Sequence, residues 1–240
     1  MTGTLINIAT VLLGGAVGLV FSGRLPERTR QTVIAGLGLF TAAYGVQSFS
    51  MSENVIVVLI SLLLGGILGE WWRIEARLQE FGALLERRFT GGSEDGDSGN
   101  QFIRGFLTAS LVFCVGPMTI LGSIQDGLSG DYSLLAIKSV LDGFAALAFA
   151  STLGVGVLFS VVVILVFQGG LSVLASAAQA FITAEMMSEL VAVGGILLIG
   201  IAVSSLLEIK PIRVGNFLPA LIVAPLIVAL LAALNIDSLP

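Results

Sequence analysis

Apolar runs of about 17–20 residues recur along this chain, and each is long enough to cross roughly 30 Å of hydrocarbon as a helix. Hydrophobic residues make up 56% of the 240 positions and charged residues only 11%, which no soluble domain of this size requires. The sequence therefore predicts an all-α fold, a polytopic membrane helical bundle of about eight transmembrane helices. The predicted spans are 5–21, 32–49, 55–72, 106–124, 134–153, 155–167, 190–207 and 217–234.

Residues 168–189 follow the sixth predicted span and are apolar at first and then polar. The segment is too short and too glycine-flanked for a ninth span, so we expect a re-entrant or surface helix. Its polar side chains are spaced so that they share one helical face; they are Gln168, Ser172, Ser176, Gln179 and Thr183. That face could line an aqueous vestibule, or it could be the wet side of a surface helix.

The arginines and lysines of the short loops predict the orientation of the chain. These residues lie in the loops after the first span, after the third span and between the seventh and eighth spans. With eight spans in total, all of these loops are on the same side of the membrane, which the basic residues identify as cytoplasmic. They are Arg24, Arg28, Arg30, Arg73, Arg77, Arg87, Arg88, Arg104, Lys210 and Arg213. Both termini are then extracytoplasmic. The N-terminus lacks a basic region and a small-residue cleavage site, which predicts a retained first span.

A long hydrophilic stretch divides the chain into three parts. We expect a first three-helix membrane half (1–72), a cytoplasmic amphipathic helix with a flexible linker (73–100), and a second membrane half with broken helices (101–240). Apolar side chains spaced by three and four predict the amphipathic helix; they are Trp71, Ile74, Leu78, Phe81 and Leu85. The helix could dock a partner, or it could lie at the membrane interface.

Two further patterns concern helix packing. TVLLGGAVG followed by VIAG resembles TILGSIQDG followed by VLDG, and three intervening spans would make these inverted repeats, a common transporter architecture. A third copy is suggested by the alignment of Gly15, Pro26 and Arg28 with Gly200, Pro211 and Arg213. LLGGAVG and LLGGILG are both GxxxG arrangements, which are typical of close helix packing within a chain or in a homo-oligomer.

Lys138 and Asp142 lie inside an apolar run, LLAIKSVLDGFAALAFAS. Each charge costs about 2.5 to 3.5 kcal/mol at the centre of a membrane helix, and the i,i+4 spacing allows the two to pair. Lys138 is close to the start of its span and could extend toward the outer surface. Asp142 is deeper, so it belongs either to a solute or ion path or to a structural bond between helices.

A Gly-Pro break interrupts the fourth predicted span at Gly116 and Pro117. Proline removes a donor and frees a backbone carbonyl, which inside a membrane must face protein, water or a cation. Oxygen-bearing side chains that suit hard cations or protons follow the break; they are Thr119, Ser123, Gln125 and Asp126. The alternative is an ordinary proline kink followed by a hydrophilic turn.

Several classes of function are disfavoured by what the chain lacks. Histidine is absent, which removes the commonest general base and zinc ligand, and a phosphate-binding glycine loop is missing. Aspartyl chemistry has only Asp126 and Asp142 to use, and Asp126 is expected at the outer interface. The net charge of −5 and the lack of a basic patch argue against nucleic acid. We expect no enzyme, cofactor or metal site, and no nucleic-acid partner.

Four segments carry a resemblance to a bacterial family: GTLINIATVLLGGAVG, VGPMTILGSIQDGLSGD, KSVLDGFAALAFASTLGVGV and the proline-rich last span. The chain resembles the YqgA-like and YdfK-like bacterial inner-membrane proteins over essentially its whole length, most specifically in the GPMxILGSIQDG block. The resemblance implies a location in the bacterial cytoplasmic (inner) membrane. The family is grouped as a domain of unknown function, so the resemblance implies neither substrate nor mechanism.

Two functions remain open at this point. The first is a transporter or channel for a small ion or solute, with a cation or proton favoured, Asp142 and Lys138 in the path, and residues 116–126 forming part of the site. The alternative is a noncatalytic membrane scaffold or a lipid- or partner-binding protein that uses the helix at 71–89. The expected partners are the lipid bilayer, the small ion or solute and, through the glycine-lined faces, a second copy of the chain.

Overall fold

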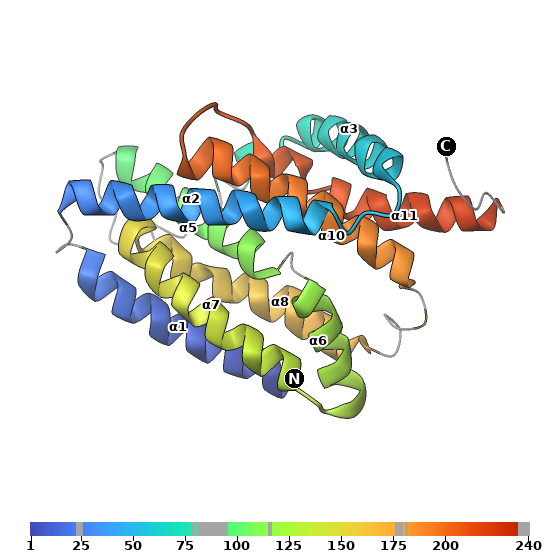
Figure 1. Ribbon diagram of the computed structural model, residues 1–240, viewed down its shortest axis with the longest axis horizontal. Coiled ribbons are helices and arrows are strands. Elements are labelled where there is room, and N and C mark those ends of the chain that lie inside the picture. Colours follow the sequence, from blue (N-terminus) through green and yellow to red (C-terminus); the bar gives the residue numbers. More distant parts are fainter. Residues whose placement is uncertain are drawn as a thin grey trace. The chain divides into compact units, whose positions relative to one another are not determined.

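The computed structural model describes residues 1–22, 26–77, 80, 96–114, 117–175, 180 and 182–234. These residues are almost entirely helical, and no strand occurs among them. Seven helices are long and apolar enough to span a membrane, which confirms the predicted polytopic helical bundle. In chain order (Figure 1) the elements are α1 Thr2–Ser22, α2 Glu27–Phe49, α3 Val55–Trp72, α5 Gly96–Cys114, α6 Pro117–Ser129, α7 Ser133–Leu153, η1 Val155–Phe159, α8 Ser160–Val173, α10 Ala184–Ile201, η2 Ala202–Leu206, η3 Val214–Phe217 and α11 Ala220–Ala233.

The distribution of side chains is that of a protein surrounded by lipid. Large apolar side chains are exposed, among them Leu13, Phe144 and Val166 at about 70%. Polar side chains in the same helices are buried, including Thr4 and Asn7. An aqueous protein would place these two classes the other way round, because exposed apolar area is unfavourable in water.

The helices fall into two compact units. Unit 1 consists of Met1–Leu37 and Leu78–Gln179, and unit 2 of Gly38–Arg77 and Ala180–Pro240. Helix α2 contributes to both units. The predicted membrane halves, 1–72 and 101–240, likewise each contribute to both.

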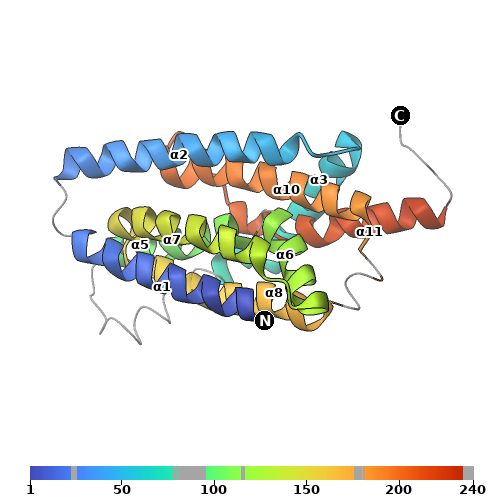
Figure 2. The same cartoon turned by 60° about the horizontal axis from the view of Figure 1, so that its bottom comes forward.

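Helices α1 and α7 pack directly against each other in unit 1, as Figures 1 and 2 both show. A Cβ atom at Gly14 would collide with the carbonyl oxygen of Gly143, and one at Gly18 with the carbonyl oxygen of Leu147. The residue numbers rise together along both helices, so α1 and α7 run parallel. The absence of side chains at these glycines allows the two backbones to approach closely.

Helices α5 and α6 form a bent pair, with an angle of 61° between them. The middle of α5 meets the end of α7, where Gly105 lies beside Leu153, whereas α6 meets the beginning of α7, where Gly122 lies beside Leu135. The pair therefore runs from one end of α7 to the other, which favours one broken span over a re-entrant loop. Counted as one span, the pair brings the candidate spans of the described residues from seven to the predicted eight.

The fourth predicted span, 106–124, is therefore not one continuous helix. Helix α5 ends at Cys114 and α6 begins at Pro117. Proline has no N–H to donate and its ring excludes the carbonyl of the preceding turn, so a new helix starts there. The predicted interruption is present, while Gly116 itself lies outside the described residues.

The two ends of the segment 168–189 belong to longer helices. Its first residues continue α8 as far as Val173, and its last residues belong to α10, which begins at Ala184. Between these helices residues 175 and 180 are helical, and the rest of the predicted re-entrant or surface helix lies largely outside the described residues. Thr183 does not continue the polar face of α8, because its hydroxyl accepts a hydrogen bond from the amide of Met186 and caps α10. Ser176 and Gln179 lie outside the described residues.

The hydrophilic stretch also begins and ends differently from the prediction. Trp71 belongs to α3 rather than to an amphipathic helix, and Arg73 closes α3 in a left-handed conformation with φ of 52°. Residues 74–77 are helical, whereas Leu78, Phe81 and Leu85 lie outside the described residues. Helix α5 begins at Gly96, so the last residues of the predicted linker are helical.

Unit 2 uses the same glycine packing. In α3, Gly65 lies against the backbone of Ala220 at the beginning of α11, and Gly69 against the backbone of Asn216 in η3, so α3 is antiparallel to this segment. The part of α2 that belongs to unit 2, residues 38–49, packs against α10 (Figure 2). A side chain added at Gly45 of α2 would meet a backbone carbonyl of α10.

We predict that Gly14→Ala destabilises unit 1, because the added methyl group must push α7 away from α1. Overpacking of this kind costs about 1–3 kcal/mol. Gly36→Ala is the matched control, because no heavy atom lies within 4 Å of a Cβ at Gly36. Thermal unfolding in detergent should show a lower midpoint for Gly14→Ala and a midpoint near wild type for Gly36→Ala. Equal midpoints for the two variants would contradict the close contact.

Candidate functional site

The carboxylate of Asp142 in α7 is the centre of a buried polar cluster in unit 1. Its Oδ2 atom accepts hydrogen bonds from the ammonium group of Lys138 and, at 2.9 Å, from Nδ2 of Asn7 in α1. All three residues are at most 7% exposed. The predicted i,i+4 ion pair is therefore formed, and its second partner comes from a neighbouring helix.

The cluster extends to a third helix through amide side chains. Nδ2 of Asn7 also donates to Oε1 of Gln168 in α8 at 3.0 Å, and Nε2 of Gln168 lies 3.3 Å from the hydroxyl of Thr4 in α1. Thr4, Asn7 and Gln168 are fully buried. We define the polar cluster as Thr4, Asn7, Lys138, Asp142 and Gln168.

Helical spacing explains why three separate helices contribute to one site. Thr4 and Asn7 are three residues apart, and Lys138 and Asp142 are four apart, so each pair occupies one face of its helix. The glycine contacts between α1 and α7 bring these faces together. The sequence thus positions the polar cluster through an apolar, glycine-dependent interface.

Two buried polar atoms near this cluster have no hydrogen-bond partner among the described residues. They are Oδ1 of Asn7 and the hydroxyl of Ser172, which lies one turn beyond Gln168 on α8. A buried carbonyl without a partner is uncommon and is usually satisfied by water or an ion. The cluster therefore has capacity to bind a further polar species.

The helix break lies against α7, the helix that carries Lys138 and Asp142. The ring of Phe113, beside Cys114 at the end of α5, packs against the ring of Phe149 in α7, with 6.4 Å between the centroids. Across the break, the hydroxyl of Thr119 donates to the carbonyl of Phe113 at 2.9 Å. The hydroxyl of Ser123 in turn donates to the carbonyl of Thr119. Thr119 and Ser123 were predicted as ligands, but in this conformation their hydroxyls satisfy backbone carbonyls.

Asp126 and Gln125 form their hydrogen bonds outside the polar cluster. The buried carboxylate of Asp126 accepts from the amide of Gly3 at 3.1 Å and pairs with the α-ammonium of Met1 at 2.7 Å, so it caps the beginning of α1. Gln125 donates to the exposed carboxylate of Asp131. Neither residue has a hydrogen bond to the polar cluster among the described contacts.

Asp131 lies in the loop between α6 and α7. The hydroxyl and the amide of Ser133 both donate to its carboxylate, and these bonds hold the pKa of Asp131 below its usual range. Asp131 is therefore an ionised surface carboxylate. Its position outside the spans makes it a useful comparison for Asp142.

The structure brings together Lys138, Asp142 and Gln168 from the predicted sites. Thr4 and Asn7 were not predicted as site residues, although their spacing of three in an otherwise apolar first span was a detectable signal. Of Gly116 and Pro117, only the backbone of Pro117 is described, at the start of α6. No three His, Cys, Asp or Glu side chains in the described ranges lie close enough together to hold a metal ion.

Comparison with known proteins assigns the chain to a family. The family described as "Protein of unknown function (DUF554)" matches residues 2–229. The chain belongs to the DUF554 family. Sequence comparison also found two relatives that agree with the resemblance.

Two such relatives cover nearly the whole chain. The uncharacterized membrane protein YdfK of Bacillus subtilis is 28% identical over 240 residues, which is 98% of this chain and 99% of YdfK. The uncharacterized protein YqgA of Escherichia coli is 33% identical over 222 residues, which is 92% of this chain and 94% of YqgA. No solved structure matches the chain. This DUF554 chain is thus a membrane protein whose site must be interpreted from its own geometry.

We predict that Lys138→Met destabilises the protein by about 3 kcal/mol, because it leaves a buried carboxylate without its cation. The double variant Lys138→Met/Asp142→Asn should be destabilised less, because both charges are removed together. Ser139→Ala is the control on the same helix, since it removes only a hydroxyl bonded to the carbonyl of Leu135.

The single cysteine, buried Cys114, provides the measurement, because in detergent, with no ion gradient, unfolding exposes it to a thiol-reactive dye. Midpoints should follow the order Ser139→Ala, double variant, Lys138→Met, from highest to lowest. A double variant no more stable than Lys138→Met would show that the two charges are not coupled.

Proposed function

We propose that this protein is a transporter or channel for a small ion or solute, with a monovalent cation or a proton as the favoured species. The observation that supports this most strongly is the polar cluster, in which an ionisable pair and two amides lie between three membrane-spanning helices. Ionisable side chains inside transmembrane segments are costly, and they commonly mark ion paths and proton relays.

The ligand chemistry favours a hard cation or a proton. The cluster offers the carboxylate of Asp142, the unpartnered Oδ1 of Asn7 and, one turn from Gln168, the unpartnered hydroxyl of Ser172. Oxygen ligands without sulfur or imidazole suit alkali and alkaline-earth cations and protons. A single carboxylate gives too little negative charge for tight binding of a divalent ion, so a monovalent species is favoured.

The alternative, a structural bond between helices, is consistent with the pairing of Asp142 but accounts for less of the site. Replacing a buried ion pair with well-packed apolar groups is often neutral or stabilising. The glycine contacts already join α1 to α7, so the ion pair is not required to hold them together. A purely structural role also does not explain why Oδ1 of Asn7 has no hydrogen-bond partner among the described residues.

The remaining parts of the proposal concern location and architecture. The resemblance to bacterial membrane proteins supports a location in the bacterial inner membrane. The basic loops, with eight crossings, support an orientation in which both termini are extracytoplasmic. Inverted repeats remain a proposal that rests on the sequence alignment alone. We propose no enzymatic activity. A second copy of the chain remains a proposed partner through exposed apolar faces.

We predict that Asp142→Asn abolishes ion flux in proteoliposomes, because it removes the ionisable group on which the path depends. Flux would be measured under imposed proton, sodium and potassium gradients. Asp131→Asn is the matched control, since it neutralises one exposed carboxylate outside the spans and should leave flux unchanged.

Undiminished flux through Asp142→Asn would show that Asp142 is not part of the ion path. Absence of flux in the wild type under all three gradients would favour the scaffold or lipid- and partner-binding alternative. In that case deletion of residues 74–89, rather than substitution of Asp142, should produce the functional defect.

We also predict that Cys114 becomes more reactive toward a water-soluble, membrane-impermeant thiol reagent when an ion gradient is applied. Transport requires water to reach the polar cluster on α7, and Cys114 ends α5 at the break, next to Phe113, which packs against α7. The rate of labelling in proteoliposomes should rise with the gradient in the wild type and not in Asp142→Asn. Equal rates with and without a gradient, in protein that carries flux, would place the path elsewhere.

A further inference from the structure

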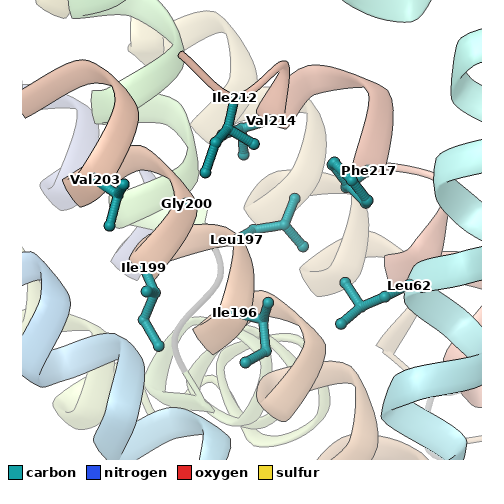
Figure 3. Close-up of a pocket in the computed structure, with 9 residues that line it drawn as sticks. All are labelled: Leu62, Ile196, Leu197, Ile199, Gly200, Val203, Ile212, Val214 and Phe217. Atoms are coloured by element: carbon teal, nitrogen blue, oxygen red, sulfur yellow. The ribbon is translucent and has the colours of Figure 1, made fainter. Parts of the chain in front are cut away.

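Unit 2 contains an apolar cavity of about 230 Å³ between α3, α10 and residues 212–217. In Figure 3 the side chains of Leu62 and Leu197 point into it from facing helices, and Ile212, Val214 and Phe217 border it. Engineered apolar cavities of roughly 150 Å³ remain dry and bind small hydrocarbons, so this cavity is large enough to do the same. Several of its lining residues are only half-buried, so it reaches the molecular surface.

The backbone around the cavity is irregular. Gly200 lines it without a side chain, and α10 changes to a π-helix at Ala202–Leu206, which contributes Val203. Glu208 follows in a left-handed conformation with φ of 53°. π-Helical turns occur frequently at functional sites, and a non-glycine residue in this conformation is uncommon. The cavity is therefore formed by the special geometry of this segment rather than by loose packing of regular helices.

The cavity lies near the end of unit 2 that carries basic residues. Leu62 is about 12 Å along α3 from Glu70, at 1.5 Å for each residue. Arg213 lies in the chain between the lining residues Ile212 and Val214 and forms an ion pair with Glu70 at 2.9 Å. Lys210 is exposed and has no ion-pair partner in the part of the chain that the structure describes. The predicted orientation places this end on the cytoplasmic side.

We propose that the cavity binds one acyl chain of an anionic phospholipid, whose phosphate group is bound by Lys210 and Arg213. The dry lining suits a hydrocarbon chain and offers no partner to a polar ligand. The basic side chains at the same end supply the charge that distinguishes an anionic from a zwitterionic headgroup. Glu70 and Glu208 limit the local positive charge, so the preference depends on Lys210 in particular.

The experiment uses the full-length protein in detergent and native mass spectrometry, with dioleoyl-phosphatidylglycerol and dioleoyl-phosphatidylcholine as separate probes. Wild type should retain one phosphatidylglycerol in preference to phosphatidylcholine. Gly200→Leu should lose it, because the new side chain occupies the cavity. Gly170→Leu is the matched control in unit 1, where no heavy atom lies within 4 Å of an added Cβ and no basic residue is near in sequence.

Charge is tested separately from the cavity. Lys210→Gln should weaken phosphatidylglycerol binding about fivefold, the effect expected for one basic side chain, and leave phosphatidylcholine binding unchanged. Arg28→Gln is the control for loss of an exposed basic residue. If Gly200→Leu fails to fold, Val203→Phe fills the same space.

Three results would overturn the proposal. They are retention of phosphatidylglycerol by a folded cavity-filling variant, wild-type binding by Lys210→Gln, and equal retention of the two lipids by the wild type. The first result would show that the cavity is not the lipid-binding site, and the other two would show that the site does not recognise an anionic headgroup. None of these outcomes depends on ion flux, so failure here would leave the proposed transport function untouched.

Discussion

The hydrocarbon of the bilayer offers no hydrogen-bond partners, and this constraint explains most of the buried polar side chains. Some lie within helices and bond the carbonyl of the preceding turn, as Ser61 and Ser139 do, and others lie where helices begin or break. The carboxylate of Asp126 accepts from the amide of Gly3 at the start of α1, and the hydroxyl of Thr119 satisfies the carbonyl of Phe113 across the break. In unit 2 the carboxylate of Glu189 accepts from two backbone amides, at 2.8 Å each, immediately before α3.

Asp142 differs from the other two buried carboxylates in what it binds. Its described hydrogen bonds come from the side chains of Asn7 and Lys138, and none comes from a backbone amide. It therefore does not repair a helix end. A carboxylate in the middle of a regular helix, with side-chain partners alone, has no structural task that apolar packing could not perform, and this contrast is the strongest argument for a functional role.

Local patterns predicted what depends on local geometry. Hydropathy predicted the spans, the i,i+4 rule predicted that Lys138 and Asp142 would pair, and the Gly-Pro dipeptide predicted the break. The contribution of Asn7 depends on α1 lying parallel to α7, a long-range arrangement that no local periodicity reveals. Gln168 was assigned to a separate helix because Gly169 and Gly170 follow it, yet these glycines continue α8 in the structure. Glycine in an apolar span favours packing as often as it ends a helix.

Charge balance determines how the polar cluster could carry a cation. With Asp142 ionised and Lys138 protonated the pair is neutral, and a bound monovalent cation would add a net positive charge in a medium of low dielectric constant. That charge is unfavourable, so for the proposed binding of a cation the ammonium of Lys138 would have to move away from Asp142. Lys138 lies close to the beginning of α7, where a long side chain can extend toward the interface. Asp142 cannot leave in this way, so under the proposed transport function the exchange of Lys138 for the cation is the simplest cycle that keeps the site neutral.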